Sequence, residues 1–108
     1  MPNAIPEVLT RYFAAANAQD VEGMSALFAG DAVVRDEGRE HRGLAAIRGW
    51  MEETIEKYDY TVEPTAFVER EGKSIVAGLV SGNFPGSPAS IRHEFMLARG
   101  KIVRLEIG

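Results

Sequence analysis

The spacing of apolar residues changes from a helical period to a strand period near residue 60. In residues 5–18 the apolar side chains recur at intervals of three and four, which is typical of one face of a helix. Four later segments are instead rich in β-branched and aromatic residues and alternate with a period of two: 60–70, 74–83, 89–98 and 101–107. Helices followed by strands predict an α+β fold, with helices packed against one face of a curved antiparallel sheet.

The first half of the chain also contains signals for two further helices and one strand. Asp20 is a suitable N-cap for a second, short helix that includes Phe28 and ends at Gly30-Asp31. Residues 32–36 predict a short strand, and the polar residues 37–43 predict a loop. A third helix follows, with Trp50 and Thr54 expected at the flank of an apolar face formed by Leu44, Ile47, Met51, Ile55 and Tyr58.

Turns between the later strands are marked by glycine and proline. Glu71-Gly72 and Arg99-Gly100 are typical of tight hairpin turns, and the two prolines of residues 84–88 indicate a longer, stiff loop. With 108 residues the chain is the usual size of one domain, so we expect a single domain over 1–108.

Composition excludes several classes of function. The net charge of −4 comes from scattered charges without a basic run, which argues against binding to nucleic acid. Because no apolar stretch approaches the ~20 residues that span a bilayer, we expect no membrane association. The first residues lack the features of a signal peptide, and cysteine is absent, so a cytoplasmic location is expected. His41 and His93 lie far apart without a metal-binding spacing, and no nucleotide-binding motif occurs; neither a metal nor a cofactor is expected.

Three polar residues fall within apolar patterns. Tyr12 lies on the apolar stripe of the first helix, and Asp36 shares a strand face with Ala32 and Val34. His93 alternates with Ile91, Phe95 and Leu97. If these side chains converge, burial would raise the pKa of the carboxyl group toward the range in which it can take and return a proton near neutral pH.

Each of these residues also has a purely structural interpretation. Tyr12 could be an amphipathic core residue, Asp36 could belong to a turn, and His93 could be a satisfied structural histidine. His41, in the predicted polar loop, is expected to be solvated. The apolar residues Trp50, Met51, Phe67 and Phe95 either line a pocket or fill it.

The segments RYFAAANAQD (11–20), AVVRDEG (32–38) and SIRHEFMLARGKIV (90–103) resemble the SnoaL-like and ketosteroid isomerase branch of the nuclear transport factor 2-like superfamily. The resemblance implies a cystatin-like cone with an interior pocket, formed by a sheet wrapped around three helices. It also implies that Tyr12 is the oxyanion donor and Asp36 the general base. His93 stands where the isomerases have a protonated aspartic acid, which is a departure from their pattern.

The function expected from these observations is that of an isomerase-like or polyketide cyclase-like enzyme without a cofactor. Asp36 would transfer a proton next to the carbonyl of a small apolar substrate, with Tyr12, joined by His93, at the oxyanion. The last strand, KIVRLEIG, lacks the extended ending of polyketide cyclases, and no Asp-Arg-Asp set of an epoxide hydrolase can be assembled. The alternatives are a non-catalytic binder, its cavity closed by Trp50, Met51, Phe67 and Phe95, or a dimeric interaction module. The resemblance also implies a homodimer through the exposed sheet face.

Overall fold

The structure is a computed structural model that describes residues 5–108, and in this range it contains three helices and one six-stranded sheet. The predicted α+β fold is confirmed. The helices are α1 (Glu7–Asn17), α2 (Val21–Ser25) and α3 (Gly43–Tyr58). The strands are β1 (Phe28–Asp36), β2 (Arg39–Arg42), β3 (Thr61–Arg70), β4 (Lys73–Ser81), β5 (Ala89–Ala98) and β6 (Lys101–Ile107).

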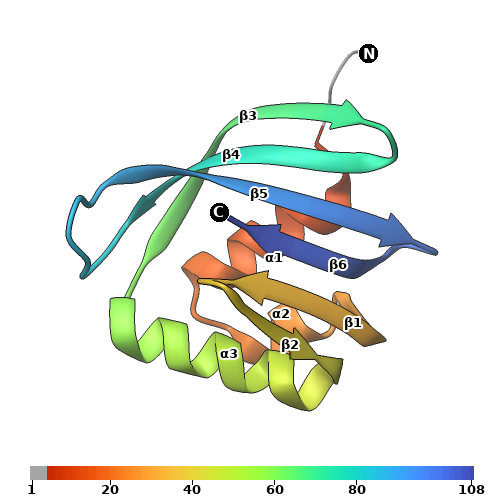
Figure 1. Ribbon diagram of the computed structural model, residues 1–108, viewed down its shortest axis with the longest axis horizontal. Coiled ribbons are helices and arrows are strands. Elements are labelled where there is room, and N and C mark those ends of the chain that lie inside the picture. Colours follow the sequence, from red (N-terminus) through yellow and green to blue (C-terminus); the bar gives the residue numbers. More distant parts are fainter. Residues whose placement is uncertain (1–4) are drawn as a thin grey trace.

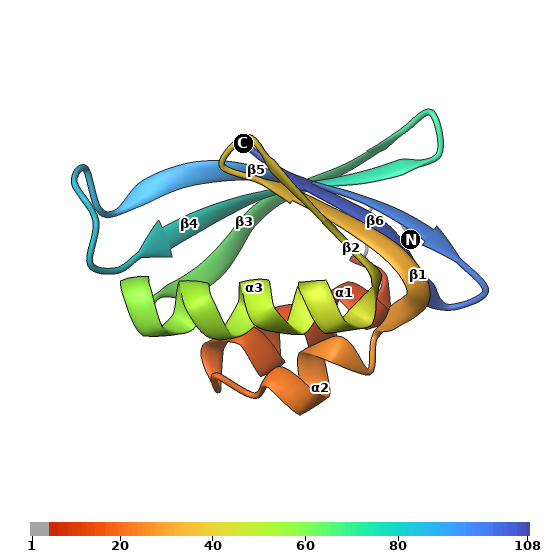
Figure 2. The same cartoon turned by 60° about the horizontal axis from the view of Figure 1, so that its bottom comes forward.

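The sheet and the helices form two layers. The strands lie in the order β2-β1-β6-β5-β4-β3, and the sheet is strongly twisted across this width (Figure 1). Figure 2 shows the sheet curving over the helices, which all lie on its concave side. Among the described residues no helix has both the length and the apolar character needed to span a membrane.

One pair of neighbouring strands departs from the predicted antiparallel sheet. β1 and β6 are parallel, with Val34 opposite Leu105, whereas the other neighbouring strands are antiparallel. No hairpin fixes the relative direction of these two strands, because β2, α3 and β3 to β5 separate them in the sequence. This pairing joins the early hairpin to the later meander in one continuous sheet.

Three two-residue turns share one backbone conformation. Glu71-Gly72 and Arg99-Gly100, predicted as hairpin turns, have positive φ at both residues. Glu37-Gly38 has the same conformation, with φ of 54° and 75°, and joins β1 to β2. Because two positive φ values define the hairpin turn of type I′, all three turns match the right-handed twist of their strands. The predicted loop over residues 37–43 is therefore wrong, since residues 39–42 form β2.

Two further boundaries differ from the prediction. Phe28, expected in the second helix, begins β1, because α2 ends at Ser25. Trp50 and Thr54, expected at the flank of the third helix, are buried together with Ile47 and Met51. Because α3 packs against β1, β2 and α2, more than one side of the helix is covered.

Aromatic side chains form the centre of the core below the sheet. Tyr12 of α1 makes edge-to-face contacts with Phe13, Phe28 and Phe95, at centroid distances of 5.3, 5.9 and 5.5 Å. Such edge-to-face pairs add to the free energy gained from burial. The Tyr12 ring is thus fixed by contacts from α1, β1 and β5.

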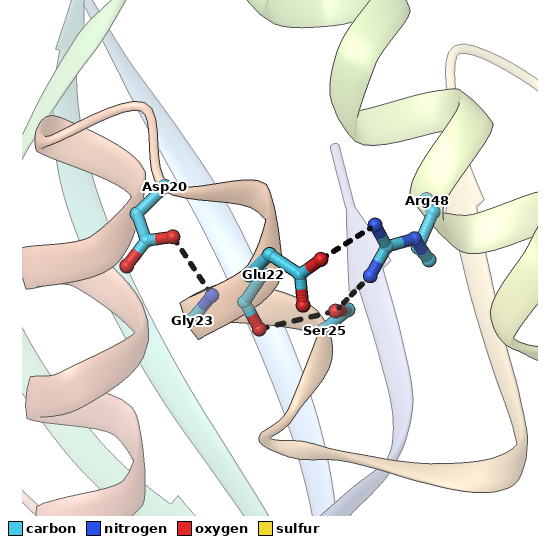
Figure 3. A network of polar contacts seen from close by, with 5 residues as sticks. All are labelled: Asp20, Glu22, Gly23, Ser25 and Arg48. Atoms are coloured by element: carbon cyan, nitrogen blue, oxygen red, sulfur yellow. Dashed lines mark hydrogen bonds and ion pairs between the residues drawn. The ribbon is translucent and has the colours of Figure 1, made fainter.

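Polar contacts hold the short helix α2 against α3 (Figure 3). Asp20 accepts a 2.9 Å hydrogen bond from the backbone N–H of Gly23, which confirms it as the N-cap. Arg48 of α3 donates to Oγ of Ser25 at 2.9 Å and forms an ion pair with Glu22 at 3.3 Å. The contacts of Arg48 thus connect α3 to the buried Ser25 and the exposed Glu22 of α2.

Candidate functional site

A pocket of about 190 Å³ is lined by residues of α1 and α3 and by residues of the sheet. The three residues predicted from the sequence as catalytic candidates, Tyr12, Asp36 and His93, all line it. The other lining residues are Glu37, Trp50, Thr54, Tyr58, Tyr60, Val62, Val80, Phe84, Ile91 and Ile107. The fold therefore brings residues from two helices, five strands and the turns and loops beside them to one cavity.

Asp36 is the last residue of β1, on the face that also buries Ala32 and Val34. Its Oδ2 accepts a 3.0 Å hydrogen bond from Nε1 of Trp50. Burial raises the pKa of the Asp36 carboxyl, and the charge of Glu37 adds to the rise. The hydrogen bond from Trp50, the backbone at Glu37 and the charge of His41 lower this pKa and offset the rise in part. The carboxyl group of Asp36 therefore keeps its proton to a higher pH than an exposed aspartate does.

Tyr12 and Tyr60 place two phenol groups in the same pocket as this carboxyl. Burial, followed by the effects of Tyr60 and Asp36, raises the pKa of Tyr12 well above its ordinary value. Burial and the charge of Asp36 raise the pKa of Tyr60 to about 12. Both hydroxyl groups therefore keep their protons at neutral pH, so each can donate a hydrogen bond to a ligand.

The sequence interpretation missed Tyr60, although a signal was present. Tyr60 lies two positions before Val62, and both residues line the pocket. The period of two that identified Asp36 and His93 would have placed Tyr60 on the inner face of the sheet as well. Tyr60 is the first residue of the strand predicted over residues 60–70, and the structure places it just before β3.

His93 lies on β5 and is only 6% exposed. Its Nδ1 is 3.1 Å from the carbonyl oxygen of Ile91. In the tautomer with its proton on Nδ1 the ring donates to this oxygen, and the other nitrogen is an acceptor. Burial lowers the pKa of His93, against the effect of the backbone of Ile91 and Val76, so the ring is neutral at neutral pH.

A glycine on β4 lies beneath His93. A Cβ atom at Gly78 would lie 2.8 Å from Cγ2 of Val62 and 3.3 Å from Cε1 of His93. Both of these neighbours line the pocket, whereas Gly78 does not. The close approach of the β4 backbone to the imidazole ring therefore depends on the missing side chain.

Glu37, Tyr58 and Phe84 form the rim of the pocket, where its lining meets the surface. The hydroxyl of Tyr58 donates a 2.6 Å hydrogen bond to Glu37. The Phe84 ring meets the Tyr58 ring edge-on at 5.9 Å, and Nζ of Lys57 lies 5.1 Å from the centroid of the Tyr58 ring. Contacts from the β1–β2 turn, from α3 and from the β4–β5 loop thus meet at this rim.

His41 does not occupy the solvated loop position predicted for it. It lies half-buried on β2, opposite Val34, and its ring is 6.2 Å from the ring of Trp50. The sequence of β2 did not predict the burial of His41, because the other residues of this strand are exposed and charged. His41 covers the indole whose nitrogen is bonded to Asp36.

The four apolar candidates separate into two groups. Trp50 lines the pocket, whereas Met51, Phe67 and Phe95 lie outside its lining. Met51 and Phe95 are fully buried in the core, and Phe67 is half-buried on β3 opposite Val76. Within residues 5–108 no three histidine, aspartate or glutamate side chains are grouped closely enough to hold a metal ion together.

Comparison with known proteins identifies relatives of the whole chain. The family described as the SnoaL-like domain matches residues 9–105. The crystal structure of a candidate polyketide cyclase from Sinorhizobium meliloti is 38% identical over 96% of this chain and 95% of that chain, with a TM-score of 0.93.

Two more distant structures share the fold. A Catenulispora acidiphila protein with a ketosteroid isomerase-like fold, solved in complex with trimethylamine, is 20% identical over 97% of this chain and 86% of that one, with a TM-score of 0.84. An epoxide hydrolase/cyclase-like enzyme of pyran ring formation in the polyether salinomycin is 21% identical over 94% and 86%, with a TM-score of 0.81. At these identities the similarity extends to the fold alone.

Proposed function

This chain belongs to the SnoaL-like domain family, and on this premise we propose that it is a cofactor-independent enzyme that moves a proton next to the carbonyl group of a small apolar substrate. The observation that carries the proposal is the convergence of a buried carboxyl group, Asp36, and a phenol, Tyr12, on one pocket. The likeness to a candidate polyketide cyclase at 38% identity supports this class of chemistry.

In the proposed reaction Asp36 is the base. Its carboxylate takes a proton from the carbon next to the carbonyl, and the electron pair of the broken C–H bond moves to the carbonyl oxygen to form an enolate. In an isomerisation the resulting carboxylic acid returns the proton to a different carbon. In a cyclisation the enolate carbon instead attacks a second carbonyl of the same substrate, and the new alkoxide takes up the proton. Both reactions share the first step and need no redox partner.

Tyr12 and Tyr60 are the proposed donors to the enolate oxygen. Each keeps its proton because burial raises its pKa, and a donor already in place stabilises charge as that charge develops. His93 is not assigned to this role, since its ring proton is directed to the carbonyl of Ile91. In the neutral ring the free nitrogen is suited to accept a hydrogen bond from a hydroxyl group of the substrate.

The volume of the pocket limits the substrate. At about 190 Å³ it is smaller than the roughly 300–1,000 Å³ of pockets that hold drug-sized ligands. The apolar part of the lining comes from Val62, Val80, Ile91 and Ile107. We therefore propose a substrate of one ring or a short chain, smaller than a steroid.

Deuterium exchange tests the first step without knowledge of the natural substrate. The protein is incubated in D₂O with small cyclic ketones, including cyclohex-3-enone, and the loss of the α-proton signals is followed by ¹H NMR. We expect exchange that depends on the protein and falls roughly 100- to 10,000-fold in Asp36→Asn. Equal exchange rates with the wild type and this variant would overturn the proposal.

The alternative is a small-ligand binder that performs no chemistry. The same apolar lining with a few polar groups would serve to hold and orient a ligand. The structure of the Catenulispora acidiphila protein in complex with trimethylamine supports the use of this fold for binding a small molecule. Tight binding of a ketone without exchange of its α-protons would favour this alternative.

We also propose that two copies of the chain associate through the convex face of the sheet. This face carries large apolar side chains that are partly exposed: Val68 at 43%, Leu79 at 36% and Met96 at 38%. Between them lie the ion pairs of Glu94 with Lys73 and Arg92, which can find further partners in a second copy. Burial of this face would remove apolar surface from water.

A further inference from the structure

The charged groups of the pocket lining have one sign. Asp36 and Glu37 contribute two carboxyl groups, and no lysine or arginine occurs among the residues that line the pocket. The buried histidine of the lining, His93, is neutral because burial lowers its pKa. The pocket therefore offers an anionic ligand no cationic partner, whereas a cationic ligand would meet two carboxyl groups.

The partners of Asp36 are insufficient for a buried ion. Its hydrogen bonds come from neutral groups, the indole N–H of Trp50 and the backbone at Glu37. A buried carboxylate normally has a cation as its partner, and without one it holds its proton more tightly. Burial is the first cause of the raised pKa of Asp36, and a cation bound beside the carboxylate would lower this pKa.

Aromatic side chains make up much of the remaining lining: Tyr12, Trp50, Tyr58, Tyr60 and Phe84. Aromatic rings attract cations through the negative charge on their faces, and methylated ammonium groups are recognised in this way. The rim already shows this interaction, since Nζ of Lys57 lies 5.1 Å from the centroid of the Tyr58 ring. A cation inside the pocket would find rings of the same type.

We infer that the pocket binds small methylated ammonium compounds, with Asp36 as the counter-ion and the aromatic lining around the methyl groups. This inference rests on the proposed use of the pocket as a ligand site, but it does not depend on proton transfer there. Methylated ammonium is favoured over a primary amine because its methyl groups can pack against the aromatic rings and against the apolar walls formed by Val62, Val80, Ile91 and Ile107. The volume of about 190 Å³ admits a group of this size.

The inference predicts how binding varies with pH. The cation binds the ionised form of Asp36, so its affinity rises with pH through the pKa of this carboxyl and reaches a plateau above it. The other titratable groups that line the pocket or adjoin Asp36 are Tyr12 on α1, Tyr58 on α3, Tyr60 before β3, Glu37 in the turn, His41 on β2, Arg39 on the same strand opposite Asp36, and His93 on β5. The two phenols keep their protons throughout the neutral range, since burial raises their pKa values.

The test compares choline with 3,3-dimethylbutan-1-ol, which has the same shape and no charge. Binding of each is measured by isothermal titration calorimetry at pH 8 and low salt, together with the indole N–H signal of Trp50 by NMR. We expect choline to bind at least about fivefold more tightly than the alcohol, and this ratio to fall to near one in Asp36→Asn. Phe84→Leu at the rim provides a second variant, in which choline affinity should fall more than alcohol affinity.

The outcomes distinguish this inference from the proposed enzymatic function. If the alcohol binds as tightly as choline, or if Asp36→Asn retains the preference, recognition of a cation at Asp36 is excluded. Absence of choline binding at millimolar concentration also overturns the inference. Choline binding without exchange of ketone protons would support the inference and exclude the proton transfer, and exchange without choline binding would do the opposite.

Discussion

The indole Nε1 of Trp50 donates a 3.0 Å hydrogen bond to Oδ2 of Asp36. This bond joins the middle of α3 to the last residue of β1, so the carboxyl group is positioned by two elements rather than by a flexible loop. It also lowers the pKa of Asp36, which burial raises. Position and protonation of Asp36 are therefore coupled through one side chain, and the first prediction follows from this coupling.

The acid limb of the pH–rate profile should report Asp36. Proton abstraction needs the carboxylate, so kcat/KM should be lost as the pH falls through the raised pKa of this group. Trp50→Phe removes a hydrogen bond that lowers the pKa, and the limb should therefore move to higher pH. The measurement is kcat/KM for ketone deuteration against pH, with the carboxyl carbon of Asp36 titrated by NMR. A limb that stays in place in Trp50→Phe contradicts this assignment.

Asp36→Asn should stabilise the protein at neutral pH. The ordinary pKa of an aspartate is 3.8, and folding raises the pKa of Asp36 above this value. Between the two pKa values the folded protein holds a proton that the unfolded chain releases. The free energy of unfolding therefore falls as the pH rises from 3.8 through the folded-state pKa. Asparagine removes the buried charge and keeps an oxygen that can accept from Trp50. We expect its Tm to exceed the wild-type value by a few degrees at pH 7, and the difference to disappear below pH 3.8. Thermal unfolding followed by circular dichroism checks both points; a difference independent of pH would indicate a packing effect instead.

Tyr12→Phe and Tyr60→Phe should separate activity from stability. Burial and nearby groups, and no hydrogen bond within residues 5–108, raise the pKa of each phenol. Removal of either hydroxyl group therefore leaves no hydrogen-bond partner unsatisfied. We expect the free energy of unfolding to change little and the rate of ketone deuteration to fall roughly 100- to 1,000-fold for a lost oxyanion donor. Urea denaturation and the exchange assay measure the two effects. If either variant keeps its full rate, that tyrosine is not a donor.

A charge on the convex face of the sheet should prevent self-association. Met96 is 38% exposed on β5, where a carboxylate would lie next to its copy or to Glu94 in a dimer. We expect the wild type to elute with twice the chain mass of 11.8 kDa and Met96→Glu with the mass of one chain. Size-exclusion chromatography with light scattering measures this directly. Glu52→Lys, on the exposed surface of α3, is the control and should leave the mass unchanged.

Periodicity predicted those parts of the fold in which a single face is buried. The stripe that contains Leu9, Tyr12 and Phe13 identified α1, and the alternation through Ala32 and Val34 correctly placed Asp36 on the inner face of β1. In each case the burial of one side of a regular element leaves a regular trace in the sequence. The same argument oriented His93 correctly toward the pocket.

Features that depend on tertiary context left no such trace. β2 is an edge strand of charged residues, so nothing in its pattern distinguishes it from a loop; the clue was the Glu37-Gly38 turn, which repeats the form of Glu71-Gly72. The parallel pairing of β1 with β6 depends on how the β1–β2 hairpin joins the later strands, not on the sequence of either strand alone. The contact of Nδ1 of His93 with the carbonyl oxygen of Ile91 likewise depends on a backbone position that no side-chain pattern encodes.

Gly78, which lies beneath His93, influences the shape of the pocket although it does not line it. Gly78 is not among the lining residues, yet a single methyl group at this position would press on Val62 and on the imidazole ring, which both belong to the lining. The shape of the pocket therefore depends in part on the absence of a Cβ atom at Gly78. A substitution at Gly78 would therefore alter the shape of the pocket without replacing any of the residues that line it.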